Sequence, residues 1–350
     1  MARGPTRRDV EAVVAATARR GDVGEVKFRV VAPALGDEVA WEAPGARRQH
    51  FIASSTKLFT LAIVLRMRER RRIAFTTRAA EILPSDLLRG LNTFGGADHW
   101  DAYTVEQLLA HTTGIPDYFE GPLKGGPAII ERMVRADFGW SLGDALEEAR
   151  RRPAAFAPGS DRAVYSDTNY QLLGAIVEGV SGMSFAETLA EEILDPLGLT
   201  DTYMFTDVTL DRYDTISPIL FGRGAPRIPR AMASFGPDGG IVSTTADSMR
   251  FLRAFAGGEL FAPEAIGDVT ARWHRVFPPL RYGVGIMKYE LPALLTGFRK
   301  VPPMIGHSGA SGHVMFWAPG RDLYVVGTVN QAGKRSLPYR TMTRIAMACR

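Results

Sequence analysis

The chain has 350 residues, 46% of them hydrophobic, which is typical of a globular protein with a sizeable core and excludes a disordered one. The single cysteine, Cys349, excludes a disulfide framework, and the six histidines form no cluster with the spacing of metal ligands. The net charge of +4 comes from scattered arginines, and the densest run, residues 66–72, has few aromatic neighbours. We therefore expect no metal, no cofactor and no nucleic-acid partner.

No segment contains the roughly 20 consecutive apolar residues of a membrane span. Residues 1–24 are basic and then amphipathic, without the apolar core of a signal peptide. The sequence therefore predicts a cytoplasmic protein without a membrane partner, and it leaves the oligomeric state unknown.

The first predicted elements are a helix near residues 10–16 and two strands at 26–32 and 38–42. Hydrophobic and polar residues alternate in both strands, and a Gly-Asp turn separates them, so we expect an antiparallel pair. Residues 54–73 then predict a long, buried helix that opens with a Ser-Ser-Thr cluster of the N-cap type. Ser54 is therefore expected at the start of a helix.

The middle of the chain is predicted to be helical, and the C-terminal part returns to strands. Helical patterns lie at residues 104–111, 142–151, 168–180, 184–194 and 245–256, strand patterns at 303–308, 312–318 and 323–329, and a closing helix at 338–349. We predict an α+β fold in which residues 1–75 and 235–350 form an antiparallel sheet flanked by helices. Residues 76–234 would form an inserted, mainly helical domain, with the active site in the cleft between the two.

Three short patterns carry the chemistry: Ser54-Ser55-Thr56-Lys57, Tyr165-Ser166-Asp167 and His307-Ser308-Gly309. A serine hydroxyl is a poor nucleophile near neutrality and needs a group to accept its proton. Lys57, three residues after Ser54, projects from the same helix face and can reach it. The main-chain N–H of Ser54, at the helix N-terminus, can stabilise the negative charge that grows on a carbonyl oxygen under attack.

The order and spacing of these patterns resemble the serine β-lactamase and penicillin-binding-protein superfamily. The resemblance is strongest to its branch of class C β-lactamases, D,D-peptidases and family VIII carboxylesterases. Further landmarks of that branch are the segments at residues 108–116, 156–159, 196–199 and 239–247.

The resemblance implies a β-lactamase/transpeptidase-like fold and a serine hydrolase that acts on esters or amides through an acyl-enzyme. It implies Ser54 as nucleophile, with Lys57 and Tyr165 managing the proton, and leaves open which of these two is the base. It also implies the main-chain N–H of Ala310 as the second oxyanion donor. The same resemblance assigns substrate contacts to Asp167, His307, Ser308 and Gly309.

Two residues depart from the family pattern. His307 stands where β-lactamases usually carry lysine, so we expect it to be partly charged near neutrality and to attract a substrate carboxylate only weakly. Asp167 replaces an asparagine, and we expect it to pair with Lys57, hold that lysine protonated and shift the base role toward Tyr165. Both changes argue against efficient penicillin hydrolysis and, with no export signal, favour small esters or amides.

Two other readings compete with this one. The segment Gly306-His307-Ser308-Gly309-Ala310 imitates the nucleophile elbow of α/β-hydrolases, which would make Ser308 the nucleophile, but strand patterns rather than a helix follow it. Alternatively, the fold could persist as a binding or regulatory module without turnover. We expect His111, Asn169 and Tyr170 to have structural rather than catalytic roles.

Overall fold

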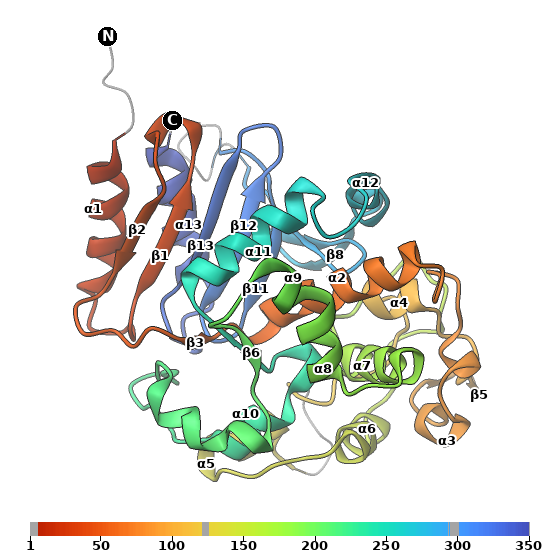
Figure 1. Cartoon of the computed structure of the whole chain (residues 1–350). Coiled ribbons are helices and arrows are strands. Elements are labelled where there is room, and N and C mark those ends of the chain that lie inside the picture. The colour runs from red at the N-terminus through yellow and green to blue at the C-terminus, as the bar shows by residue number, and fades with distance from the viewer. Residues whose placement is uncertain (1–5, 121–125, 293, 295–300, 350) are drawn as a thin grey trace.

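A large antiparallel sheet joins the two ends of the chain in the computed structural model, which describes residues 6–120, 126–292, 294 and 301–349. In Figure 1 the red N-terminal strands lie beside the blue C-terminal ones. The order is β2-β1-β13-β12-β11-β10-β9-β8, so the predicted pair and the predicted C-terminal meander are both confirmed. The strands are β1 (Lys27–Val31), β2 (Val39–Glu42), β8 (His274–Phe277), β9 (Leu280–Tyr282), β10 (Met287–Tyr289), β11 (Met304–Gly309), β12 (His313–Ala318) and β13 (Leu323–Thr328).

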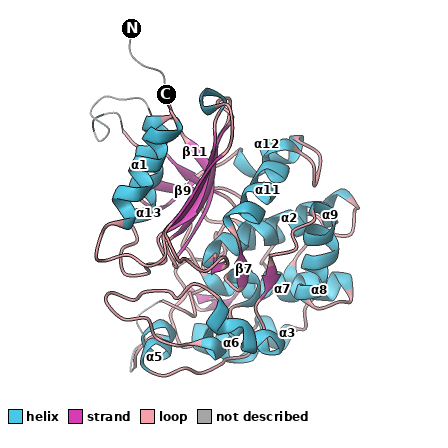
Figure 2. Ribbon diagram, turned by 60° about the vertical axis from the view of Figure 1, so that its left-hand side comes forward, coloured by secondary structure: helices cyan, strands magenta, loops and turns pink. Residues whose placement is uncertain are grey.

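Helices cover both faces of this sheet. Helices α1 (Arg7–Ala18) and α13 (Leu337–Ala348) pack on one face, and α2 (Thr56–Glu69) and α11 (Thr245–Gly257) lie on the other (Figure 2). Side chains alternate between the faces along each strand, so Phe316 belongs to the core under α13, and its neighbour Trp317 packs on Phe255 of α11.

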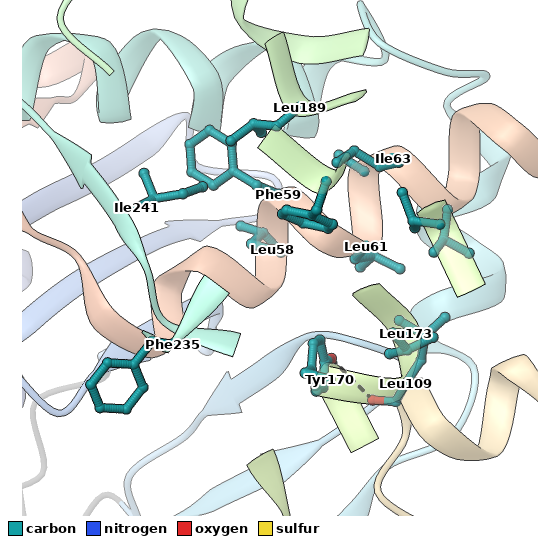
Figure 3. Packing of buried hydrophobic residues seen from close by; sticks show 14 of the residues in the cluster. Leu58, Phe59, Leu61, Ile63, Leu109, Tyr170, Leu173, Leu189, Phe235 and Ile241 are labelled. Carbon is teal, nitrogen blue, oxygen red and sulfur yellow. Dashed lines mark hydrogen bonds between the residues drawn. The ribbon is translucent and has the colours of Figure 1, made fainter. Parts of the chain in front are cut away.

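Helix α2 is the central element of the hydrophobic core on the face of the sheet that α2 and α11 cover. Its Phe59 stacks on Phe251 of α11 with ring centroids 3.6 Å apart, and Figure 3 shows Leu58, Phe59 and Leu61 surrounded by side chains from several elements. A 3₁₀ turn, η2 (Ala53–Ser55), precedes α2, which begins at Thr56. The predicted N-cap is wrong: Ser55 occupies the cap position without a capping hydrogen bond, because its hydroxyl contacts His313 instead.

The chain between the sheet segments is mainly helical (Figure 1). The division of the chain into two domains at residues 75 and 234 remains a prediction. The small sheet β3-β7-β6 contains strands from both of these predicted domains. The elements are η1 (Pro33–Leu35), β3 (His50–Phe51), η3 (Ala79–Glu81), α3 (Ser85–Leu88), β4 (Thr93–Phe94), β5 (Ala97–Asp98), α4 (Val105–Leu109), α5 (Ile129–Arg135), α6 (Leu142–Arg150), α7 (Asp167–Ser181), α8 (Phe185–Leu189), η4 (Ala190–Leu194), α9 (Asp195–Leu197), β6 (Tyr203–Met204), η5 (Asp207–Thr215), α10 (Pro229–Ser234), η6 (Gly236–Asp238), β7 (Ile241–Ser243) and α12 (Glu264–Thr270).

Among the described residues, no single helix has the length and apolar character to cross a membrane. One sharply bent pair, Asp167–Ser181 with Phe185–Leu197, meets the length and composition criteria together.

Candidate active site

Ser54 lies in the tight turn η2, between β3 and α2, and faces a cleft of about 2230 Å³. The preceding residue, Ala53, has φ of +45°, in the left-handed region, which costs a non-glycine residue roughly 1–2 kcal/mol. Such strain persists only where the surrounding packing fixes the backbone. Ala310, whose main-chain N–H is the expected second oxyanion donor, lines the same cleft.

Lys57 is held by three acceptors. Its Nζ lies 3.2 Å from Ser54 Oγ and 2.6 Å from Asp167 Oδ1, and it donates to the main-chain oxygen of Asp238 at 2.6 Å. These three acceptors match the three N–H donors of an ammonium group. The Nζ also lies 5.3 Å and 5.0 Å from the ring centroids of Tyr165 and Tyr170, close enough for cation–π attraction. The structure therefore contains the expected contact between Lys57 and Asp167.

Tyr165 lies just before α7 and lines the same cleft as Ser54. Its hydroxyl hydrogen-bonds to Ser54, and its ring packs on His111 with centroids 4.4 Å apart. Burial, together with the charge of Asp167, raises the pKa of Tyr165 well above its usual value of 10, and the hydrogen bond to Ser54 offsets this only in part. The resting side chain is therefore a neutral phenol.

Two further carboxyl groups, Asp117 and Asp238, lie beside Asp167, and the sequence reasoning missed both. Asp117 Oδ1 accepts the main-chain N–H of Asp167 at 2.8 Å. Asp238 Oδ2 accepts the Tyr118 hydroxyl at 2.8 Å and Gln171 Nε2 at 2.9 Å. Burial and the charge of Asp167 raise the pKa of Asp117 to about 7, and the same two causes raise the pKa of Asp238 well above its usual 3.8.

His307 does not lie where a substrate contact requires it. Its ring is fully buried on β11, with Nε2 2.9 Å from the Tyr282 hydroxyl and Nδ1 bound to the main chain of Ser308. Burial lowers the pKa of His307 to about 3, so the ring is neutral at physiological pH. The expectation of a partly charged His307 that attracts a substrate carboxylate is therefore wrong, because neighbours that pack the ring also exclude it from the cleft.

Ser308 and Gly309, the next two residues of β11, do line the cleft. The Ser308 hydroxyl hydrogen-bonds to Tyr339 of α13, and β11 continues into β12 rather than into a helix. The alternative of an α/β-hydrolase elbow at Ser308 is therefore wrong. At Gly309 a Cβ would overlap the carbonyl oxygen of Ile52, so glycine lets β11 pack closely against the turn that carries Ser54.

His111, Asn169 and Tyr170 connect the second motif to the helices behind it. His111 Nδ1 accepts hydrogen bonds of 3.2 Å from both the main-chain N–H of Ser166 and the amide of Asn169. Tyr170 donates to the main-chain oxygen of Leu109 at 3.2 Å, the dashed line in Figure 3. These contacts fix the backbone that follows Tyr165, in keeping with the structural roles expected of the three residues.

The fold and these contacts together define a class of protein. The site combines a serine at a strained turn, a lysine one helical turn later and a tyrosine that contacts the serine. On an antiparallel sheet with helices on both faces, these residues are typical of serine hydrolases with the β-lactamase/transpeptidase-like fold. A family model described as Beta-lactamase matches residues 3–346, and the chain belongs to that family.

Individual relatives are more distant. A "Putative D-alanyl-D-alanine carboxypeptidase" from Escherichia coli K12 is 30% identical over 158 residues, which are 43% of this chain and 32% of that protein. The chain thus matches only about a third of that relative's length.

Two solved structures share the fold over nearly the whole chain. The D-amino acid amidase from Ochrobactrum anthropi SV3 complexed with D-phenylalanine has a TM-score of 0.79 at 17% identity, covering 97% of this chain and 98% of that one. EstCE1, described as a hydrolase with promiscuous acyltransferase activity, has a TM-score of 0.74 at 20% identity, covering 98% and 97%.

Proposed function

We propose that this protein hydrolyses small esters or amides through an acyl-enzyme on Ser54. The observation that carries the proposal is the position of Lys57 Nζ, which contacts the Ser54 hydroxyl and the Asp167 carboxylate at once. The names of the two structural relatives, an amidase and an acyltransferring hydrolase, support an acyl-transfer reaction without identifying the substrate.

In the proposed acylation step, Ser54 Oγ bonds to the carbonyl carbon, and its proton passes to Lys57 as Lys57 gives one of its own protons to Asp167. Asp167 is a suitable acceptor because it lies 2.6 Å from Nζ. The phenol of Tyr165 is neutral at rest, so it carries a proton that it can donate to a basic leaving group. It protonates the departing oxygen or nitrogen and recovers its proton from Lys57, which in turn recovers one from Asp167.

The oxyanion of the tetrahedral intermediate accepts hydrogen bonds from the main-chain N–H groups of Ser54 and Ala310. Loss of one such donor typically raises the barrier by about 3 kcal/mol. Water then attacks the acyl-enzyme by the same proton path in reverse, which releases the acid and restores Ser54.

A substrate panel with matched serine variants tests the proposal. We expect wild-type protein to turn over p-nitrophenyl esters faster than nitrocefin, and Ser54→Ala to lose at least about a thousandfold in kcat/KM because the nucleophile is gone. Ser308→Ala removes the cleft serine that belongs to the third motif, and this variant should keep measurable turnover. Full activity in Ser54→Ala with none in Ser308→Ala would reverse the assignment, and the absence of turnover in all three proteins would favour a binding module.

A further inference from the structure

The hairpin between β8 and β9 places an apolar surface beside Tyr165. Phe277 ends β8, Leu280 begins β9, and the turn between them consists of Pro278 and Pro279. All four of these hairpin residues line the cleft. The Phe277 ring packs against the Tyr165 ring, with centroids 5.6 Å apart. The tip of the hairpin therefore lies next to the phenol that contacts the nucleophile.

The pairing of the strands extends this surface across three strands. Leu280 lies opposite Phe277 on one side and opposite Tyr289 of β10 on the other. Residues directly opposite one another in neighbouring strands point to the same face of a sheet. Leu280 and Tyr289 pack with the core under α13 on that face, and all three residues line the cleft. We name Phe277, Leu280 and Tyr289 the apolar row.

Phe277 is the exposed end of the apolar row. Tyr289 is 6% exposed and stacks on Tyr339 of α13, with ring centroids 5.2 Å apart, whereas Phe277 is 51% exposed. About half of the Phe277 surface is therefore accessible to a ligand in the cleft, although the same ring contacts Tyr165. An aromatic ring that packs on Phe277 would remove apolar surface from water and would gain ring–ring attraction.

The proposed proton path determines which part of a substrate meets the apolar row. Tyr165 protonates the departing oxygen or nitrogen, so that atom lies within hydrogen-bond reach of the Tyr165 hydroxyl. The oxyanion points to the N–H groups of Ser54 and Ala310, and the acyl chain takes the remaining direction at the tetrahedral carbon. The group attached to the departing atom is therefore the part of the substrate nearest to Phe277.

We propose that the apolar row binds an aromatic ring in the leaving group, so that the substrates are esters or amides whose alcohol or amine part carries such a ring. This rests on the proposed function, which places the leaving atom at Tyr165. Phe277 is then a residue that determines specificity for the leaving group, and it takes no part in proton transfer.

Two isomeric esters distinguish the two sides of the scissile bond. Benzyl acetate carries its ring on the alcohol part, and methyl phenylacetate carries the same ring on the acyl part. We expect Phe277→Ala to lower kcat/KM about fivefold for benzyl acetate, as for the loss of an aromatic pair, and less than about twofold for methyl phenylacetate. Phe277→Tyr keeps an aromatic ring and should recover the activity toward benzyl acetate. An equal loss with both esters, or a larger loss with methyl phenylacetate, would overturn the inference.

Phe94→Ala is the matched control, because Phe94 is 42% exposed on β4, outside the cleft. This variant should leave the ratio of kcat/KM for the two esters unchanged. A change in that ratio as large as the change in Phe277→Ala would show that the effect is not specific to the apolar row and would overturn the inference.

Binding to Ser54→Ala separates the inference from the proposed function. Adding Phe277→Ala to this variant should raise the Kd of benzyl acetate about fivefold and leave the Kd of methyl phenylacetate unchanged. That result, together with a wild-type protein that hydrolyses neither ester, would contradict only the proposed function. Equal changes in the two Kd values, or no change in either, would overturn the inference whether or not the wild-type protein is active.

Discussion

Burial is the main cause of the shifted pKa values of single side chains in this protein. His307 and His313 are both fully buried, and burial lowers the pKa of each to about 3. His313 Nδ1 hydrogen-bonds to the Ser55 hydroxyl at 2.8 Å, next to the nucleophile. Burial disfavours the charged form of the His313 ring, so acid should weaken both the fold and the turn that carries Ser54.

The pH dependence of the free energy of unfolding tests whether the buried His313 ring is neutral in the folded protein. Its folded pKa of about 3 lies below the ordinary 6.5, so the unfolded chain binds more protons between these values. Its contribution is therefore fully present above pH 6.5 and is lost as pH falls toward 3. Between pH 7 and pH 5 we expect this histidine to remove about 2 kcal/mol of the free energy of unfolding. In urea titrations His313→Gln should shrink the pH 7 to pH 5 difference by about that amount, and an unchanged difference would show that the folded ring is protonated.

At the scale of elements, the close packing of β11 on η2 positions the nucleophile. A methyl group on Gly309 would overlap the carbonyl oxygen of Ile52 and force the strand and the turn apart. We expect Gly309→Ala to lower the free energy of unfolding by about 1–3 kcal/mol, as overpacking does. It should also lower kcat/KM by about a hundredfold, because small displacements of a nucleophile are costly.

Gly267→Ala is the matched control, since a Cβ at this position in α12 meets no heavy atom within 4 Å. Alanine there should raise stability slightly through helix propensity and leave kcat/KM unchanged. If Gly309→Ala and Gly267→Ala behave alike in esterase assays and denaturation, the packing of β11 on η2 does not control the position of Ser54.

The sequence predicted some of the strands well and missed others. Alternation located β1 and β2 within about one residue, and apolar runs joined by the turn at residues 319–322 located β12 and β13 equally well. Strands β8, β9 and β10 were missed, because each has only three or four residues and such short runs carry no clear period. The capping error at Ser55 has a tertiary cause, since its hydroxyl binds His313, which is 258 residues away.

Across the whole molecule, the site depends on segments that converge from distant parts of the chain. The three motifs pointed to Ser54, Lys57 and Tyr165 because their order resembles that of a known family. No local pattern connects Asp117, Asp167 and Asp238, which meet only after folding, and none shows that His307 turns away from the cleft. The motifs therefore suggested which residues take part in the chemistry. The charge and shape of the cleft could be described only from the folded structure.

The most direct test is the mass of the enzyme during turnover. We predict that acid quenching during hydrolysis of a p-nitrophenyl ester traps protein heavier by one acyl group, and that peptide mapping places this group on Ser54. Replacing Lys57 with methionine should prevent the adduct, because the serine proton then has no route to Asp167. An adduct on Ser308, or steady hydrolysis by Ser54→Ala with no acylated protein, would contradict the account.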